Sequence, residues 1–198
     1  EIYTRLYTLS LHDALPISLL NHADRVRCAC IAQLVNAIAP IMTETGGPAW
    51  RQTIFWPFAD FTNHGHGEVL RAKIVSDTYD TTYFDPAGMD DEVRTAVPNV
   101  PYLKLAAVHD GKGGLTLFAL NRDLSQDMRL EVTARGFVNL AEAAATTLHD
   151  QDLFATNTKD APNRIAPRQL EGVRVDGDRL FAVLPAASWN VIRLRPVG

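Results

Sequence analysis

Residues 41–58 constrain the fold most, because they have the pattern of a strand end, a Gly-rich loop and a helix start in direct succession. The apolar run 38–43 has the length of a buried strand. Pro48 stands where proline is favoured, at the first position of a helix. In α/β folds such loops lie beyond the carboxyl ends of parallel strands, where ligands bind. We therefore expect one repeat of a βα architecture, which needs further strands because a single repeat cannot bury itself.

Two helices are predicted on either side of this loop. Apolar residues recur at every fourth position of residues 22–38 and form one helical stripe: Val26, Cys30, Leu34 and Ile38. Asn21 can cap the start of this helix, and Pro40 ends it. Residues 48–63 are predicted as a second helix with an aromatic face and a kink at Pro57.

From Gly65 onward the chain changes to short apolar runs separated by turn residues. This pattern predicts an antiparallel, jelly-roll-like β-sandwich. The segment 80–100, with its prolines and its acidic trio 90–92, is predicted as a long surface loop. The predicted strands are 68–76, 102–109, 115–121, 128–134, 144–148, 173–175, 180–184 and 189–194.

Residues 1–17 have no convincing period and look like a translated sequencing adapter. We expect them to be a non-native leader, so that His12 and Asp13 carry no catalytic meaning; the alternative is a genuine amphipathic arm. The predicted organisation is therefore a leader at 1–17, a helix–strand–helix segment at 18–64 and a β-sandwich domain at 65–198.

Composition excludes several classes of protein. The net charge of −4 and the scattered Lys and Arg residues argue against a nucleic-acid partner. No apolar run approaches the length that a membrane span needs. Cys28 and Cys30 have the pattern of small core residues on diverging helical positions, and without a disulfide framework a reducing, cytoplasmic location is expected.

Several candidate sites have a simpler explanation. Glycosidases need two carboxylates, and Glu44 is the only carboxylate in the strand-to-helix loop, where it can equally be solvated or cap a helix. His64 and His66 lack further ligands nearby, so no metal site is expected. The acidic trio 90–92 has the pattern of a solvated face, and residues 111–114 that of a hairpin turn rather than a phosphate loop.

Residue blocks in a fixed order carry a family resemblance. Asn-His-Ala-Asp-Arg-Val stands at 21–26, and Gly-Pro-Ala-Trp-Arg-Gln-Thr-Ile-Phe at 47–55. Further blocks follow at 117–123, 152–158 and 184–194. Together with 32–36 and 38–44, these blocks closely resemble the α-L-arabinofuranosidases of glycoside hydrolase family 51, over residues 19–195.

The resemblance implies a mixed fold: a C-terminal fragment of a (β/α)8 barrel, as helix–strand–helix, followed by the sandwich. The two catalytic glutamates of the family stand in an Asn-Glu pair and in a Glu-Trp-Asn context. This sequence has no Asn-Glu pair, and its only Trp-Asn, at 189–190, follows Ser188. No catalytic residue is therefore expected in this chain, Glu44 included, and the chain alone is expected to be inactive.

One binding residue carries over from the family. Gln52 matches the glutamine that hydrogen-bonds the arabinofuranose in the −1 subsite, and an amide can both donate to and accept from a sugar hydroxyl; the alternative is a glutamine that caps the loop. Trp50 is a second candidate, as an apolar wall, with core packing as its alternative. The resemblance implies a retaining enzyme acting on terminal arabinofuranosyl residues of arabinan or arabinoxylan, without cofactor, and often hexameric.

Two other functions remain open. A non-catalytic carbohydrate-binding or scaffold sandwich would need exposed aromatic side chains, and Tyr79, Tyr83, Phe84 and Trp189 are available, although Trp189 has the pattern of a core residue. The chain could also be the tail of an endo-glucanase or xyloglucanase of the same family.

Overall fold

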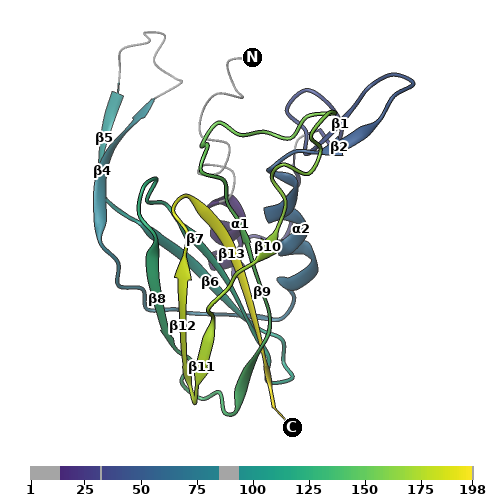
Figure 1. Ribbon diagram of the computed structural model, residues 1–198. Coiled ribbons are helices and arrows are strands. Elements are labelled where there is room, and N and C mark those ends of the chain that lie inside the picture. The colour runs from purple at the N-terminus through teal and green to yellow at the C-terminus, as the bar shows by residue number, and fades with distance from the viewer. Residues whose placement is uncertain (1–13, 32, 85–93, 198) are drawn as a thin grey trace.

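The computed structural model describes residues 14–31, 33–84 and 94–197. Within these residues, two antiparallel sheets make up the body of the molecule (Figure 1). The larger sheet has the strand order β10 (Arg168–Gln169), β9 (Leu140–Leu148), β13 (Ser188–Pro196), β7 (Leu115–Asn121), β6 (Leu103–His109) and β3 (Glu68–Leu70). The smaller sheet has the order β11 (Arg174–Asp176), β12 (Arg179–Leu184) and β8 (Met128–Thr133).

The larger sheet is covered on both faces, and strand β7 shows how. Leu117 and Ala119 face the smaller sheet and pack with Leu180 and other apolar residues of that sheet. Phe118 and Leu120, which alternate with them, belong to a second core on the opposite face. The antiparallel sandwich predicted from the sequence is confirmed, with the larger sheet as its central layer.

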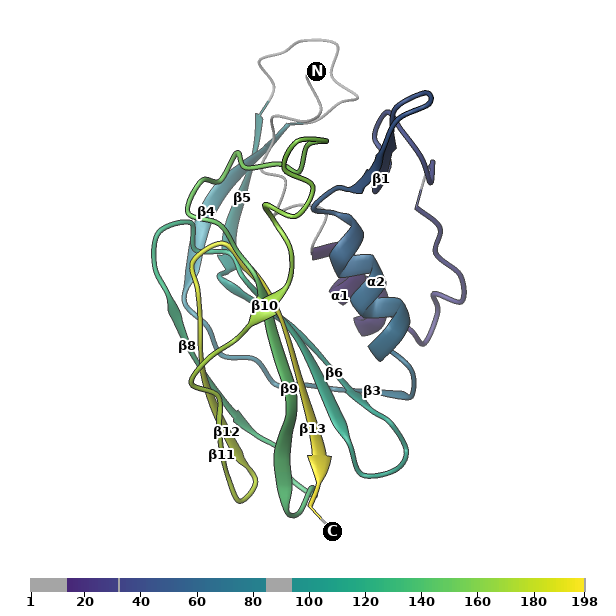
Figure 2. The ribbon, with the colours of Figure 1, turned by 45° about the vertical axis from the view of Figure 1, so that its right-hand side comes forward.

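Two helices cover the second face of the larger sheet (Figure 2). From α1 (Ala14–Asn21), Ile17 and Leu20 are buried in this second core. From α2 (Phe55–His64), Trp56 and Phe61 pack against it. The first turn of α1 falls within the expected leader, while residues 1–13 of that leader lie outside the described part.

The predicted helix at 22–38 is wrong. After α1 the chain turns and then runs without regular structure, and Gln33, Asn36 and Ala37 have positive φ angles, which no α-helix accommodates. Leu34 and Ile38 of the apolar stripe are 63% and 60% exposed. The physical reason is that helices of this length are stabilised mainly by packing of their apolar face, and the described residues leave these side chains uncovered. Cys28 and Cys30, expected in a core, are likewise exposed and free, with their Sγ atoms 3.9 Å apart.

The strand–loop–helix prediction is correct in part. A strand does occur, β1 (Ile41–Thr43), but it pairs antiparallel with β2 (Ala49–Arg51), in the segment expected to begin the helix. Helix α2 begins only at Phe55, so Pro57 lies in its first turn, where a missing N–H breaks no helical hydrogen bond and no kink is required. Because β1 pairs antiparallel with β2, the structure does not show β1 as a strand of a parallel barrel.

The predicted surface loop at 80–100 is wrong at both of its ends, while residues 85–93 lie outside the described part. Strands β4 (Thr78–Phe84) and β5 (Arg94–Pro101) form a two-stranded hairpin that extends away from the sandwich (Figure 1). The strand-favouring Thr, Tyr and Val residues outweigh the prolines on which the loop prediction rested. The acidic trio 90–92 lies outside the described residues. The remaining strand predictions are confirmed in position, although β3 ends at Leu70, six residues before the predicted end at 76.

Candidate functional site

The β1–β2 hairpin carries both candidate binding residues. Its register pairs Met42 with Trp50. The Gln52 backbone N–H donates to the Pro40 carbonyl at 2.8 Å and extends the ladder by one more bond. The turn between the strands closes where the Glu44 N–H donates to the Pro48 carbonyl at 3.1 Å. Gln52 is therefore the first residue after a closed hairpin.

Gln52 also begins the tight turn that leads into α2. Its carbonyl accepts from the Phe55 N–H at 3.1 Å, so both backbone groups of Gln52 are bonded while its side chain is half-buried. The neighbouring Thr53 is fully buried, and its Oγ1 has no hydrogen-bond partner within the described part of the chain. These two bonds fix the backbone from which the Gln52 side chain extends, and that side chain stays half-buried.

A loop of the sandwich closes over this hairpin. Asn157, in the connection between β9 and β10, is 2% exposed, and its Nδ2 donates to the carbonyls of Arg51 at 2.9 Å and Ile165 at 2.8 Å. Its Oδ1 accepts from the Ile165 N–H at 2.7 Å. The Trp50 indole N–H donates to the Asn157 carbonyl at 3.2 Å, and the Trp56 indole N–H to the Ile165 carbonyl at 3.2 Å. The bonds of Asn157 to Arg51 and Trp50, and that of Trp56 to Ile165, join residues more than one hundred positions apart.

Asn157 was missed by the sequence reasoning. It stands inside one of the resembling blocks, 152–158, but nothing local distinguishes it from an ordinary loop asparagine. A second link between hairpin and loop is the ion pair of Glu44 with Lys159 at 3.0 Å, whose side chains are both about half exposed. A surface pair of this kind contributes little stability, and Glu44 is a loop carboxylate engaged with a lysine.

A polar cluster below the hairpin fastens α2 to strand β13. The Trp189 indole N–H donates to Asp60 Oδ2 at 2.9 Å, and Trp189 is buried as expected. Burial raises the pKa of Asp60 above its usual value, although the Trp189 hydrogen bond and the charge of Arg193 oppose the shift. The Arg193 guanidinium donates to His64 Nδ1 at 3.4 Å, and burial together with the Arg193 charge lowers the pKa of His64.

The structure brings no metal-binding set together within the described residues, where no three His, Cys, Asp or Glu side chains cluster. His66 is exposed, whereas His64 contacts Arg193. Neither α1 nor α2 is long and apolar enough to cross a membrane, which holds for every helix in the described part. Of the aromatic residues considered for a glycan-binding face, Tyr79 packs on Tyr102, and the side chains of Tyr83 and Phe84 lie outside what is described.

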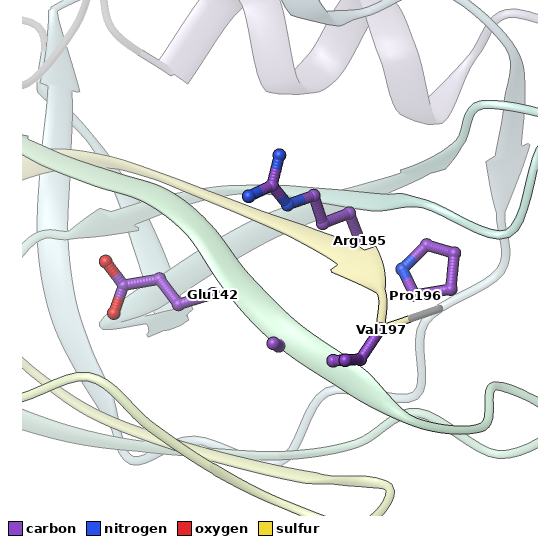
Figure 3. A pocket seen from close by; sticks show the side chains of 5 residues that line it. Glu142, Arg195, Pro196 and Val197 are labelled. Atoms are coloured by element: carbon purple, nitrogen blue, oxygen red, sulfur yellow. The ribbon is translucent and has the colours of Figure 1, made fainter.

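A pocket lies at the opposite end of the sandwich, beside the C-terminal end of β13 (Figure 3). Glu142 and Arg195 both line it, but their side chains point in different directions (Figure 3). The register explains this, because Arg195 is opposite Ala141 and Glu142 is opposite Leu194, so that the two side chains belong to different faces of the sheet. The pocket thus offers one carboxylate, not the pair that a glycosidase needs.

Comparison with known proteins decides the family. The family model described as the α-L-arabinofuranosidase C-terminal domain matches residues 13–188. The chain belongs to this family. It is 42% identical over 180 residues to an intracellular exo-α-(1→5)-L-arabinofuranosidase from Streptomyces lividans, covering 91% of this chain and 25% of that protein. It is also 41% identical over 186 residues to the intracellular exo-α-(1→5)-L-arabinofuranosidase 1 of Bacillus subtilis. That match covers 93% of this chain and 34% of the Bacillus protein.

Solved arabinofuranosidases share the fold. A family 51 α-L-arabinofuranosidase from Bifidobacterium longum superposes with a TM-score of 0.77 at 36% identity, over 93% of this chain and 34% of that one. The arabinose complex of the enzyme from Thermotoga maritima gives 0.75 at 26% identity, over 91% of this chain and 37% of that one. The chain thus spans about a quarter to a third of the length of the arabinofuranosidases it matches.

Proposed function

We propose that this chain is the C-terminal part of a retaining exo-α-L-arabinofuranosidase that releases terminal arabinofuranose from arabinan, arabinoxylan or their oligosaccharides. The observation that carries the proposal is the 42% identity, over nearly the whole chain, to a relative named for this activity. In a retaining glycosidase two carboxyl groups about 5–5.5 Å apart act as acid/base and nucleophile, and no cofactor is required. We assign both carboxylates to the part of the protein outside this chain, because neither family context occurs here.

In this proposal residues 18–64 are the last helix–strand–helix of the barrel, residues 65–198 are the sandwich domain, and residues 1–17 are a non-native leader. The exposed apolar side chains of Leu34 and Ile38 support this division, since burial against further parts of a barrel would remove them from water. The rest of the barrel would then cover the side chains that the described residues leave in solvent.

Gln52 binds the arabinofuranose in the −1 subsite. Its backbone is fixed by bonds to Pro40 and Phe55, and its amide can donate to one sugar hydroxyl while accepting from another. Trp50 forms an apolar wall beside the sugar. Its indole N–H is already bonded to Asn157, which fixes the ring and leaves a face for the C–H groups of the sugar.

The partners of the whole protein are arabinose-containing glycans and further copies of itself in a homo-oligomer. Its location is intracellular, which is supported by the names of the relatives from Streptomyces lividans and Bacillus subtilis.

The test uses the full-length protein that contains this chain, an aryl α-L-arabinofuranoside and, for comparison, an aryl β-glucoside and xyloglucan. We expect hydrolysis of the arabinofuranoside alone, no hydrolysis by the purified 198-residue chain, and loss of kcat/KM by about 10²-fold in a Gln52→Ala variant. Activity of the isolated chain would place the catalytic pair inside it and refute the assignment. Activity on xyloglucan alone would favour the endo-glucanase alternative.

A further inference from the structure

We infer that Asn157 is a positioning residue of the sugar-binding site: through it, the β9–β10 loop of the sandwich sets where the Gln52 amide points. The inference rests on the proposed function, because it takes Gln52 as the residue that contacts the sugar. It assigns a role in substrate binding to the sandwich domain, which supplies Asn157 but not Gln52.

The contacts of Asn157 converge on the residues beside Gln52. The Arg51 carbonyl, to which Nδ2 donates at 2.9 Å, belongs to the peptide that joins Arg51 to Gln52. Trp50, the residue before Arg51, donates its indole N–H to the Asn157 carbonyl at 3.2 Å. Side chain and backbone of one buried residue thus hold two consecutive positions of strand β2 immediately before Gln52.

The loop itself is held firmly enough to serve as an anchor. Asn157 closes its own loop by donating to the Ile165 carbonyl at 2.8 Å and accepting from the Ile165 N–H at 2.7 Å. Ile165 is 1% exposed and belongs to the core between the larger sheet and the helices. The Trp56 indole N–H donates to the same Ile165 carbonyl, so the beginning of α2 shares this anchor. The turn that carries Gln52 is therefore tied to the sandwich on both sides.

Removal of the Asn157 amide would leave the part-buried Arg51 carbonyl and the buried Ile165 carbonyl without this donor, and the strand end would move to find water or another partner. Displacement of a substrate-positioning group by about 1 Å can cost about 10²-fold in rate. The effect is expected in catalysis on arabinofuranosides, through Gln52, and not merely in folding.

The sandwich offers a matched control in Asn121. This residue is fully buried as well, and its Nδ2 donates to the carbonyls of Gln126, Leu184 and Pro185 at 3.0, 3.2 and 2.9 Å. Its Oδ1 accepts from the Asp123 N–H at 3.0 Å. The chemistry matches that of Asn157, but these bonds join the ends of β7 and β12 and none of them reaches the hairpin with Gln52.

The experiment measures kcat/KM of the full-length enzyme on an aryl α-L-arabinofuranoside for Asn157→Ala, Asn121→Ala, Gln52→Ala and the double variant Asn157→Ala with Gln52→Ala. We expect Asn157→Ala to lower kcat/KM by about 10- to 100-fold and Asn121→Ala to leave it nearly unchanged at the same enzyme concentration. Once Gln52 is alanine, Asn157→Ala should cost little more, because residues that act through one another are not additive.

Three results would overturn the inference: equal losses for Asn157→Ala and Asn121→Ala, fully multiplicative losses in the double variant, or an unchanged Asn157→Ala enzyme. If Asn157→Ala does not fold, Asn157→Asp takes its place, since it keeps the size and the acceptor for Ile165 but loses the donor to Arg51. A wild-type protein without arabinofuranosidase activity would refute the proposed function itself, and with it this role. Retained activity with an insensitive Asn157 refutes only the inference.

Discussion

The sandwich and the segment 22–38 carry equally clear apolar patterns, but only the sandwich folds as its pattern predicts. In strand β7, Leu117 is 1% exposed and Phe118 is fully buried, because the smaller sheet covers one face and the helices cover the other. In the segment, Leu34 and Ile38 stay 63% and 60% exposed. The difference teaches that an apolar period specifies an element only when the same chain also supplies the surface that buries it.

The junction between the two regions is polar and specific. Asn157 and the Asp60–Trp189 pair join segments that are 106 and 129 residues apart in the sequence. Such contacts hold the hairpin and α2 against the sandwich, although residues 26–31 and 33–38 of the same N-terminal part remain irregular. Substitutions in the packed part of the chain should therefore change the free energy of unfolding, whereas substitutions in the exposed segment should not.

The largest effect is expected for Trp189→Ala. This side chain is 1% exposed, its ring centroid lies 5.9 Å from that of Phe118, and its indole N–H donates to Asp60. Its loss therefore leaves a cavity and a carboxyl group without its hydrogen-bond donor. The free energy of unfolding of the 198-residue chain, measured in urea, should fall by about 3–5 kcal/mol. Phe154→Ala is the control, because that ring is 67% exposed. A small effect at Trp189 would mean that α2 does not pack on the sheet.

A pair of leucines tests the comparison most directly. Leu20 of α1 is 4% exposed and Leu34 is 63% exposed. In the 198-residue chain, Leu20→Ala should lower the free energy of unfolding by about 2–5 kcal/mol, whereas Leu34→Ala should change it by less than about 0.5 kcal/mol. Equal losses in the same urea titrations would show that residues 22–38 are packed after all.

The smallest expected effect is that of Asp60→Asn on the pH dependence of the free energy of unfolding. Because burial raises its pKa, folded Asp60 holds its proton at pH values where the unfolded carboxyl, with a pKa of 3.8, has released it. Stability therefore falls as pH rises from 3.8 through the folded pKa. Asp60→Asn keeps an oxygen that can accept from Trp189 but does not titrate, so it should lose less stability than the wild type over this range.

The control for this measurement is His64→Gln. The lowered pKa of His64 has the opposite sign, since unfolded His64 binds a proton below pH 6.5 more readily than folded His64 does, and stability rises with pH up to that value. Urea unfolding of the three proteins from about pH 4 to 7 separates the two groups. Identical pH slopes for the wild type and Asp60→Asn would rule out the buried carboxyl as their source.

Several errors of the sequence reasoning share one cause. The prolines and the acidic trio of 80–100 predict a loop, yet β4 and β5, at the two ends of that segment, pair with each other. The hairpin of β1 and β2 was predicted as strand and helix, since Pro48 suits a turn as well as a helix start. Local signals of this kind are ambiguous until a pairing partner is known.

The sequence by itself determined most strands of the sandwich, their order along the chain, the burial of Trp189 and the residue blocks that mark the family. Those features follow from short periods and from residues close together in the chain. Only the tertiary structure decided that the described residues of 22–38 are not helical, that the larger sheet is covered on both faces, and that Asn157 holds the strand before Gln52. Each of those outcomes depends on contacts between distant residues, and no local pattern records which distant group will bury an apolar side chain or accept a hydrogen bond.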